Sequence, residues 1–212
     1  MIIALTLFSC KKDEENTVQV ETQNTPISPN YFPLEVGNYW VYENYSVDTS
    51  GNETNLNKQD SVRVIRDTMV NGNRYFYMYG KEYPTNYEDR GWFRDSSGYL
   101  VSLGYQSKLN FVNFSDTLDD FINYTSNGDT LQYTFYMLHL PEIKTIVPAG
   151  EFAVIDYLGT TITSVEALQK LYDYPRYSHQ QYAENVGKVF QSFHYSASPN
   201  HIEKRLVRYR IH

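Results

Sequence analysis

Histidines and carboxylic acids are the side chains of this chain that could carry acid–base or metal chemistry. None of its five histidines has the spacing of a zinc site, although two could meet across a hairpin, namely His194 and His201; the others are His139, His179 and His212. Neighbouring acids such as Glu88–Asp89 and Asp119–Asp120 could serve glycoside hydrolysis, yet adjacent side chains of a strand point to opposite faces. The nucleophile-elbow, phosphate-loop, dinucleotide-binding and His-Glu-x-x-His motifs are absent from the sequence. We therefore expect a protein that is not an enzyme and that uses no metal or cofactor.

The single cysteine, Cys10, stands where an apolar run meets a charged segment. Residues 1–9 carry no charge, and the five residues after Cys10 are "KKDEE". The apolar run is shorter than the roughly 20 residues that a membrane-spanning helix needs, and it has the length of the apolar part of a signal peptide. Because there is no second cysteine, the chain can form no intramolecular disulfide.

The stretch "LFSC" at residues 7–10 resembles the lipobox of bacterial lipoproteins. The resemblance implies that residues 1–9 are the remnant of a signal peptide and that Cys10 becomes the acylated N-terminus. Two or more acyl chains anchor a protein stably, because each buried CH₂ contributes roughly 0.8 kcal/mol. The acidic run after Cys10 is similar to the export signal of Bacteroidota lipoproteins. It implies a protein held in the outer membrane through Cys10 and facing the cell exterior.

The net charge and the aromatic content of the chain indicate which classes of partner it could bind. The formal net charge of −7 argues against nucleic acid, since phosphate binding needs a clustered basic surface. The C-terminal run "KRLVRYR" is basic, but its alternation with apolar residues favours a solvated strand face over an anion-binding patch. Aromatic residues make up 16% of the chain, with 21 tyrosines, and tyrosine favours half-buried strand surfaces.

The pattern of apolar runs and turn residues predicts a tether followed by one folded domain. Residues 10–30 comprise Cys10 and a polar segment with two prolines, which suits a flexible linker. Residues 31–212 are predicted to form a single β domain, with a strand over 38–47, a loop over 49–57 and a strand over 60–70. Hairpin turns are expected at Asn71–Gly72, at residues 96–98 and at residues 126–129. Strands flank these turns at 74–82, 87–95, 99–105, 119–125 and 130–138, and further strands are expected at 143–147, 151–158, 186–196 and 203–212.

These elements predict a mostly β protein built on a single strongly curved antiparallel sheet, as a barrel, a half-barrel or a sandwich. One segment, near 164–173, has apolar residues at spacings of three and four and is predicted to be a short helix with Ser164 as its N-cap.

Three short motifs in this frame resemble those of an uncharacterised family of Bacteroidota outer-membrane lipoproteins. They are "YFPLEVGNYWVY" at 31–42, "VPAGEF" at 147–152 and "NVGKV" at 185–189. The family has no established activity, so the resemblance implies a location and a β fold. The motif residues have structural explanations: Gly37–Asn38 would shape a turn, Trp40 would be a core anchor, and Gly187 would sit at a bulge.

Two classes of function remain. The first is a non-catalytic binding module for a glycan, a lipid or a peptide, and the second is a structural or accessory subunit of an outer-membrane complex. A hydrolase is a distant third. The densest aromatic stretch, residues 74–93, supplies the candidate ligand contacts Tyr75, Tyr77, Tyr79 and Trp92.

Overall fold

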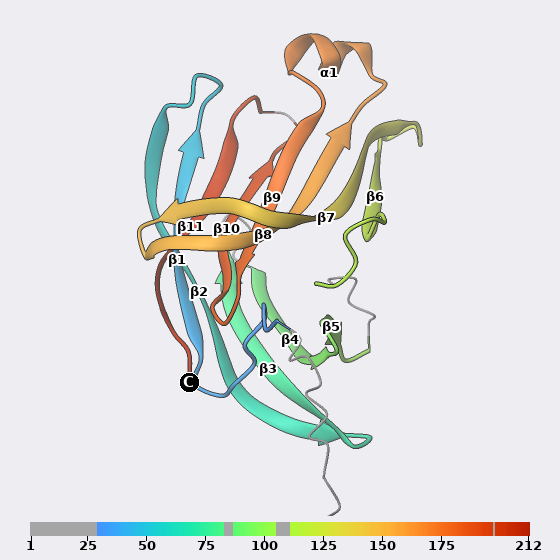
Figure 1. Cartoon of the computed structure of the whole chain (residues 1–212). Coiled ribbons are helices and arrows are strands. Elements are labelled where there is room, and N and C mark those ends of the chain that lie inside the picture. The colour runs from blue at the N-terminus through green and yellow to red at the C-terminus, as the bar shows by residue number, and fades with distance from the viewer. Residues whose placement is uncertain (1–28, 83–86, 105–110, 197) are drawn as a thin grey trace, which may run out of the picture.

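The computed structural model of the chain describes residues 29–82, 87–104, 111–196 and 198–212. In this part of the chain, eleven strands form one antiparallel sheet and one short helix lies beside it (Figure 1). The strand order is β5-β4-β3-β2-β1-β11-β10-β9-β8-β7-β6. The elements are β1 (Tyr39–Val47), β2 (Glu53–Val70), β3 (Asn73–Glu82), β4 (Tyr87–Ser96), β5 (Tyr99–Ser102), β6 (Asp119–Tyr124), β7 (Thr130–Val147), β8 (Gly150–Ile162), α1 (Glu166–Leu171), β9 (Arg176–Ala183), β10 (Gly187–His194) and β11 (His201–Arg210).

The first and last strands in the chain, β1 and β11, pair with each other in the middle of the sheet. Pairing of β1 with β11 runs from Tyr39 opposite Arg210 to Val47 opposite His201. Strands that follow one another in the chain then lead outward on both sides to β5 and β6. The predicted fold class is therefore confirmed: a mostly β chain, one antiparallel sheet and one short helix. The sheet is not closed, because β5 and β6 are its two ends, so a closed barrel does not form.

The predicted hairpin turns are present. Asn71 and Gly72 join β2 to β3 with φ values of 48° and 78°, and Ser97 and Gly98 join β4 to β5 with 56° and 84°. Positive φ at both central residues matches the twist of the flanking strands. The third turn spans residues 125–129, where the Thr125 N–H donates to the Asp129 carbonyl at 2.8 Å.

Bulges curve the sheet until one part lies across another. Register shifts occur between β1 and β2, β1 and β11, β2 and β3, β6 and β7, β7 and β8, and β9 and β10. Each extra residue bends its strand and increases the local twist. Figure 1 shows the β7–β8 hairpin crossing over β10 and β11. A backbone hydrogen bond ties the two together, since the Ala149 N–H donates to the Leu206 carbonyl at 2.9 Å.

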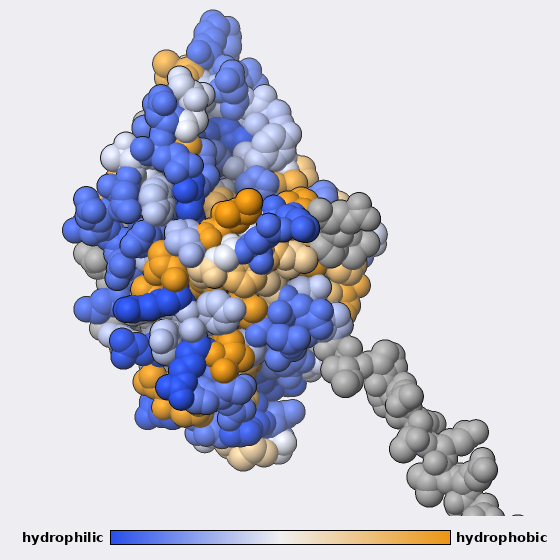
Figure 2. All heavy atoms as spheres, turned by 60° about the vertical axis from the view of Figure 1, so that its left-hand side comes forward, coloured by the Kyte–Doolittle hydropathy of each residue, from blue (hydrophilic) through white to orange (hydrophobic). Residues whose placement is uncertain are grey.

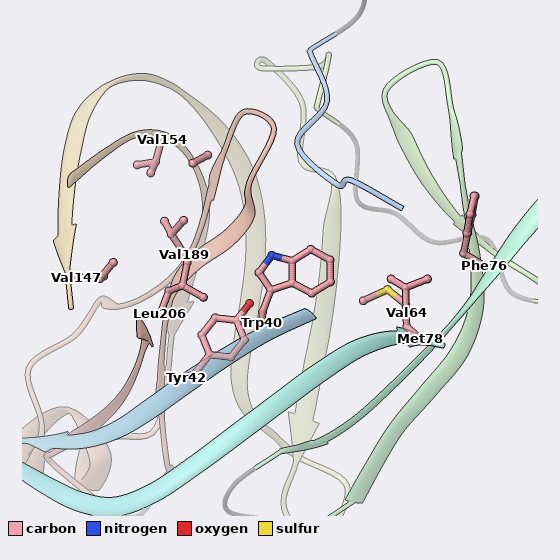
Figure 3. Close-up of a cluster of buried hydrophobic side chains, with 10 residues drawn as sticks. Trp40, Tyr42, Val64, Phe76, Met78, Val147, Val154, Val189 and Leu206 are labelled. Carbon is pink, nitrogen blue, oxygen red and sulfur yellow. The ribbon is translucent and has the colours of Figure 1, made fainter. Parts of the chain in front are cut away.

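The main core fills the inside of this curve. Trp40 and Tyr42 lie at its centre, with Val64 of β2 on one side and Leu206 of β11 on the other (Figure 3). The β7–β8 hairpin contributes Val147 and Val154. A second buried cluster lies beside it and consists of Phe111, Leu138, Ile155, Tyr157 and Tyr182. The curvature therefore lets one sheet bury apolar side chains against itself.

The motif at the start of the domain has a structural role. Asn38 is fully buried; its side-chain amide donates to the Pro33 carbonyl at 2.9 Å and its oxygen accepts the His212 N–H at 2.9 Å. Trp40 donates its indole N–H to the Val186 carbonyl at 2.6 Å. Gly187 has φ +97°, and a Cβ there would lie 3.2 Å from the Trp40 Nε1. The predicted core role of Trp40 is confirmed. The bulge expected at Gly187 falls instead between Lys188 and Phe190, and Gly187 pairs with Ala183.

The helix is shorter than predicted and its cap is different. α1 begins after Val165, not Ser164, and no side chain caps it. Instead, the Thr163 hydroxyl accepts the Val165 N–H at 3.1 Å. None of its residues is buried. Figure 1 shows that α1 lies at one end of the sheet, so its apolar side chains do not pack into the core.

Three strand assignments differ from the prediction. Residues 53–57, expected in a loop, belong to β2, and 53–55 pair with β1; they are polar because this end of the hairpin is largely exposed. Strand β9, "RYSHQQYA", was not predicted, because its polar residues hide the alternation that marks a half-buried strand. The predicted strands at 130–138 and 143–147 are one strand, β7, with an irregular register between His139 and Ile143.

Cys10 and most of the predicted tether lie outside the described residues, and so does the signal-peptide segment. Within the described ranges, no helix has the length and apolar composition to cross a membrane.

Candidate functional site

Two of the four predicted aromatic residues meet on the face of β3 and β4 that points away from the main core. Phe76 and Met78 of β3 are in the core, so the tyrosines that alternate with them face the other way. Tyr77 stands opposite Trp92 in the register, and their ring centroids are 5.0 Å apart at an interplanar angle of 60°. Both rings are half-buried.

The other two predicted residues are placed differently. Tyr75 is buried, and its hydroxyl accepts a hydrogen bond from the Arg94 Nε at 3.2 Å. Tyr79 is half-buried and stands opposite Arg63 of β2. The structure therefore brings Tyr77 and Trp92 together. Tyr79 lies two residues from Tyr77 on the same face of β3, and Tyr75 is buried. Ligand binding by these residues stays a prediction.

A groove that the sequence did not indicate lies over β9, β10 and β11, beside the end of β7. Its volume is about 550 Å³, within the roughly 300–1,000 Å³ of known ligand sites. Strand β9 contributes Tyr177, His179 and Gln181, and β10 and β11 contribute His194 and His201 among others. We call it the histidine groove. Figure 2 shows that apolar residues on one face of the molecule gather at the height of the β7–β8 hairpin, between more polar regions.

One histidine of the groove is held by a buried acid. The Nδ1 of His179 lies 2.6 Å from the Oδ2 of Asp156, a residue that is only 3% exposed. A carboxylate at this nitrogen fixes the ring orientation and directs Nε2 away from Asp156. His179 therefore presents one oriented nitrogen to the groove.

A second histidine is locked in the neutral form. The His194 Nδ1 lies 2.9 Å from a guanidinium nitrogen of Arg176, which can only donate, so Nδ1 accepts and the proton sits on Nε2, which donates to the Tyr177 carbonyl. Burial lowers the pKa of His194 to about 4; the carbonyl of Tyr177 acts against this, and the nearby charge of Arg176 adds to it. At neutral pH His194 is uncharged.

The other end of the groove holds an ion network. Arg205 donates to both oxygens of Glu53, at 2.8 and 2.6 Å, and to Glu203 at 2.8 and 2.5 Å. Glu203 also accepts from the His201 Nε2 at 3.1 Å. Burial would raise the pKa of Glu203, but the hydrogen bonds from His201 and Arg205 outweigh it and the pKa lies below its usual range. The hydrogen bonds with Glu53 raise the pKa of Arg205. Arg205 therefore offsets one of the two carboxylate charges and binds both carboxylates in place.

The oriented histidine of the groove, His179, has its second ring nitrogen directed away from Asp156. An Asp–His pair becomes catalytic when a nucleophile hydrogen-bonds to the other ring nitrogen, and no described hydroxyl does so with His179. Ser192, which also lines the groove, accepts the backbone N–H of His179 at 3.1 Å. Among the described residues, no group of three or more metal-binding side chains is close enough to hold a metal ion.

No protein-family model matches the chain, and no curated protein matches it significantly. Two solved structures resemble it weakly. One is a candidate exported protein with a YmcC-like fold from Bacteroides fragilis, with 15% identity, a TM-score of 0.47 and coverage of 84% of this chain and 98% of the other. The second is a candidate lipoprotein from Parabacteroides distasonis, with 14% identity, a TM-score of 0.45 and coverage of 87% and 100%. Similarity at this level assigns neither a family nor a function.

Sequence reasoning missed the histidine groove because its contacts are not local. Asp156 and His179 are 23 residues apart and meet because β8 pairs with β9. His194 and His201 do meet across the β10–β11 hairpin, as their spacing predicted, with ring centroids 5.4 Å apart. The hairpin spacing of this pair was visible in the sequence, but by itself it did not indicate a groove.

Proposed function

We propose that the protein is a lipid-anchored, outer-membrane binding protein that holds a neutral glycan in the histidine groove and does not catalyse a reaction. The anchor and location rest on the resemblance of "LFSC" to a lipobox and on the acidic run after Cys10. The choice of ligand rests on the groove.

The observation that carries the ligand class is a groove rich in hydrogen-bonding groups whose charged side chains already have internal partners. Its lining includes two carboxylates, Glu53 and Glu203, which both bind Arg205, and a second cation, Lys144, which is paired with Glu151 at 2.6 Å. An anionic ligand would meet more acids than cations here, and any charged ligand would compete with these internal pairs. A neutral ligand with many hydroxyl groups can use the Nε2 of His179 and the polar side chains.

An aromatic ring completes this chemistry. Tyr177 lines the groove and is 48% exposed. An exposed ring offers a flat apolar surface with a polar edge, which suits the C–H face of a sugar. The groove therefore combines a stacking surface with oriented hydrogen-bonding groups.

A glycan array tests the proposal, using the full chain with Cys10→Ser so that it is not acylated. We expect neutral glycans to bind, and Tyr177→Ala to weaken the best of them roughly fivefold, since an aromatic contact contributes about 1 kcal/mol. Tyr124→Ala is the matched control, because Tyr124 is 59% exposed and does not line the groove. Turnover of an arrayed glycan, or equal effects of the two changes, would contradict the proposal.

A second candidate function, an accessory subunit of an outer-membrane complex, is favoured by the edge strand β6. Phe121, Ile122 and Tyr124 are 45%, 40% and 59% exposed, and β6 pairs only with β7 among the described strands. An unpaired edge is a template for pairing with another chain. In solubilised native membranes, this function predicts a large assembly on a native gel that Ile122→Lys disrupts; migration as a monomer would exclude it.

A further inference from the structure

The guanidinium of Arg66 lies against the two predicted aromatic residues. Its central carbon is 4.8 Å from the Tyr77 ring centroid and 5.3 Å from that of Trp92. Arg66 stands opposite Tyr77 in the β2–β3 register, and Tyr77 stands opposite Trp92. A β-bulge between Val64 and Arg66 sets this alignment. Three strands thus hold one cation on two rings.

We propose that Arg66, Tyr77 and Trp92 form an anion-binding site for an acidic polysaccharide, separate from the histidine groove. Arg66 is exposed, and its contacts with the described residues are with rings, so its N–H groups are available. A planar guanidinium binds a carboxylate or sulfate through two parallel hydrogen bonds. The rings restrict its orientation in advance, which reduces the entropy lost on binding.

The surroundings of Arg66 are cationic. Arg63 stands opposite Tyr79 on the same side of the sheet, and Arg94 lies beside Tyr75, with its central carbon 5.7 Å from that ring centroid. These cations follow the direction in which the aromatic residues run. They give the site a local positive charge in a chain whose net charge is −7.

The described carboxylates of these strands are engaged elsewhere. Asp67 binds Arg74 at 2.6 Å, and Asp60 lies 3.0 Å from the Lys204 Nζ. Asp95 accepts the Gly98 N–H at 3.3 Å. None of them pairs with Arg66, so an anion of the ligand would face no competing internal partner among the described acids.

A polymer of acidic sugars fits this surface better than a single small anion. The site is a strip along one face of the sheet. Along it, Arg63, Arg66 and Arg94 lie beside Tyr79, Tyr77 and Tyr75 in turn. Repeated carboxylate or sulfate groups could contact Arg66 and its neighbours, and the sugar rings could rest on the exposed parts of Tyr77 and Trp92. A lipid phosphate offers the same anion chemistry, so the test separates the two sources.

The test measures binding of the full Cys10→Ser chain to polygalacturonate, to dextran sulfate, to uncharged dextran and to vesicles rich in phosphatidylglycerol. We expect one or both polyanions to bind, binding to weaken as salt rises, and uncharged dextran not to bind. For the polyanion that binds, Arg66→Gln should raise Kd about tenfold, because it removes a charge-assisted pair of hydrogen bonds. Arg66→Lys, which keeps the charge but loses the planar fork, should raise Kd about threefold.

Lys170→Gln is the matched control, because Lys170 is an exposed cation of α1, and α1 lies at the other end of the molecule from β3 (Figure 1). It should change Kd less than about twofold. Equal losses in the Arg66 and Lys170 variants would show general charge attraction and overturn the site. Absence of polyanion binding, or binding to the vesicles alone, would also overturn it. Neither result bears on neutral glycans in the histidine groove.

Discussion

Acidification from pH 7.5 to pH 5 is expected to destabilise the fold through His194. In the folded protein this imidazole accepts from Arg176 and donates to the Tyr177 carbonyl, so a second proton would face the Arg176 cation. Burial lowers its pKa to about 4 from an ordinary value of 6.5. Between these two values the unfolded chain takes up a proton that the folded chain refuses. Stability therefore falls as the pH drops below 6.5, and the loss is complete below pH 4.

The size of the effect follows from the two pKa values. At pH 5 the unfolded imidazole is 1.5 pH units below its ordinary pKa of 6.5, and each unit is about 1.36 kcal/mol, so the loss is about 2 kcal/mol. His194 keeps part of its surface in water, and solvent screening reduces the loss to about 1 kcal/mol. For a chain of this size, that corresponds to a fall of about 2–4 °C in Tm.

Urea unfolding at pH 7.5 and pH 5 measures this loss in the wild type and in His194→Gln. A glutamine can still accept from Arg176 and donate to a carbonyl, but it does not titrate. The variant should lose about 1 kcal/mol less than the wild type on acidification. His139→Gln, at an exposed histidine of β7, should behave like the wild type. Equal losses in all three proteins, or an NMR titration of His194 near pH 6.5, would refute the reasoning.

Three further predictions concern the core, the buried ion pair and the anchor. Gly187→Ala should lower the free energy of unfolding by about 1–3 kcal/mol, because the new Cβ meets Trp40 at a positive φ; an unchanged urea midpoint would contradict this. Lys204→Met should cost about 3–5 kcal/mol by removing the ammonium that lies beside the buried Asp60, and adding Asp60→Leu should recover most of the loss; a double variant no more stable than the single one would contradict it. Mass spectrometry of the native N-terminus should show an acylated Cys10; an unmodified Cys10 with residues 1–9 attached would exclude the anchor.

Local sequence patterns predicted much of the fold. Asn71–Gly72 gives a hairpin turn wherever the flanking residues can pair, because both residues tolerate positive φ. The alternation around Trp40 and Tyr42 fixes which side of β1 faces the core. The shape of the sheet was left open among three forms, because bulges and strand order set the curvature and neither follows from local composition.

The candidate sites were predicted only in part. The aromatic density of residues 74–93 pointed to Tyr77 and Trp92, which do meet, but it did not reveal that Tyr75 is covered or that Arg66 joins the pair. Arg66 is eleven positions before Tyr77 in the sequence, and the bulge in β2 decides that the two are opposite each other. No sequence pattern indicated the pairing between Asp156 and His179.

By itself, the sequence determined the class of the fold, the positions of its tight turns, its acidic charge and the chemistry available to it. These are local or summed properties, since turn preference and strand alternation act over a few residues and net charge is a total. Only the tertiary structure decided which polar groups meet. The histidine groove forms where β9, β10, β11 and the end of β7 come together. The neutral state of His194 depends on burial and on Arg176, which lies 18 residues away. Contacts between strands distant in sequence therefore turned ordinary histidines into an oriented, hydrogen-bonding site.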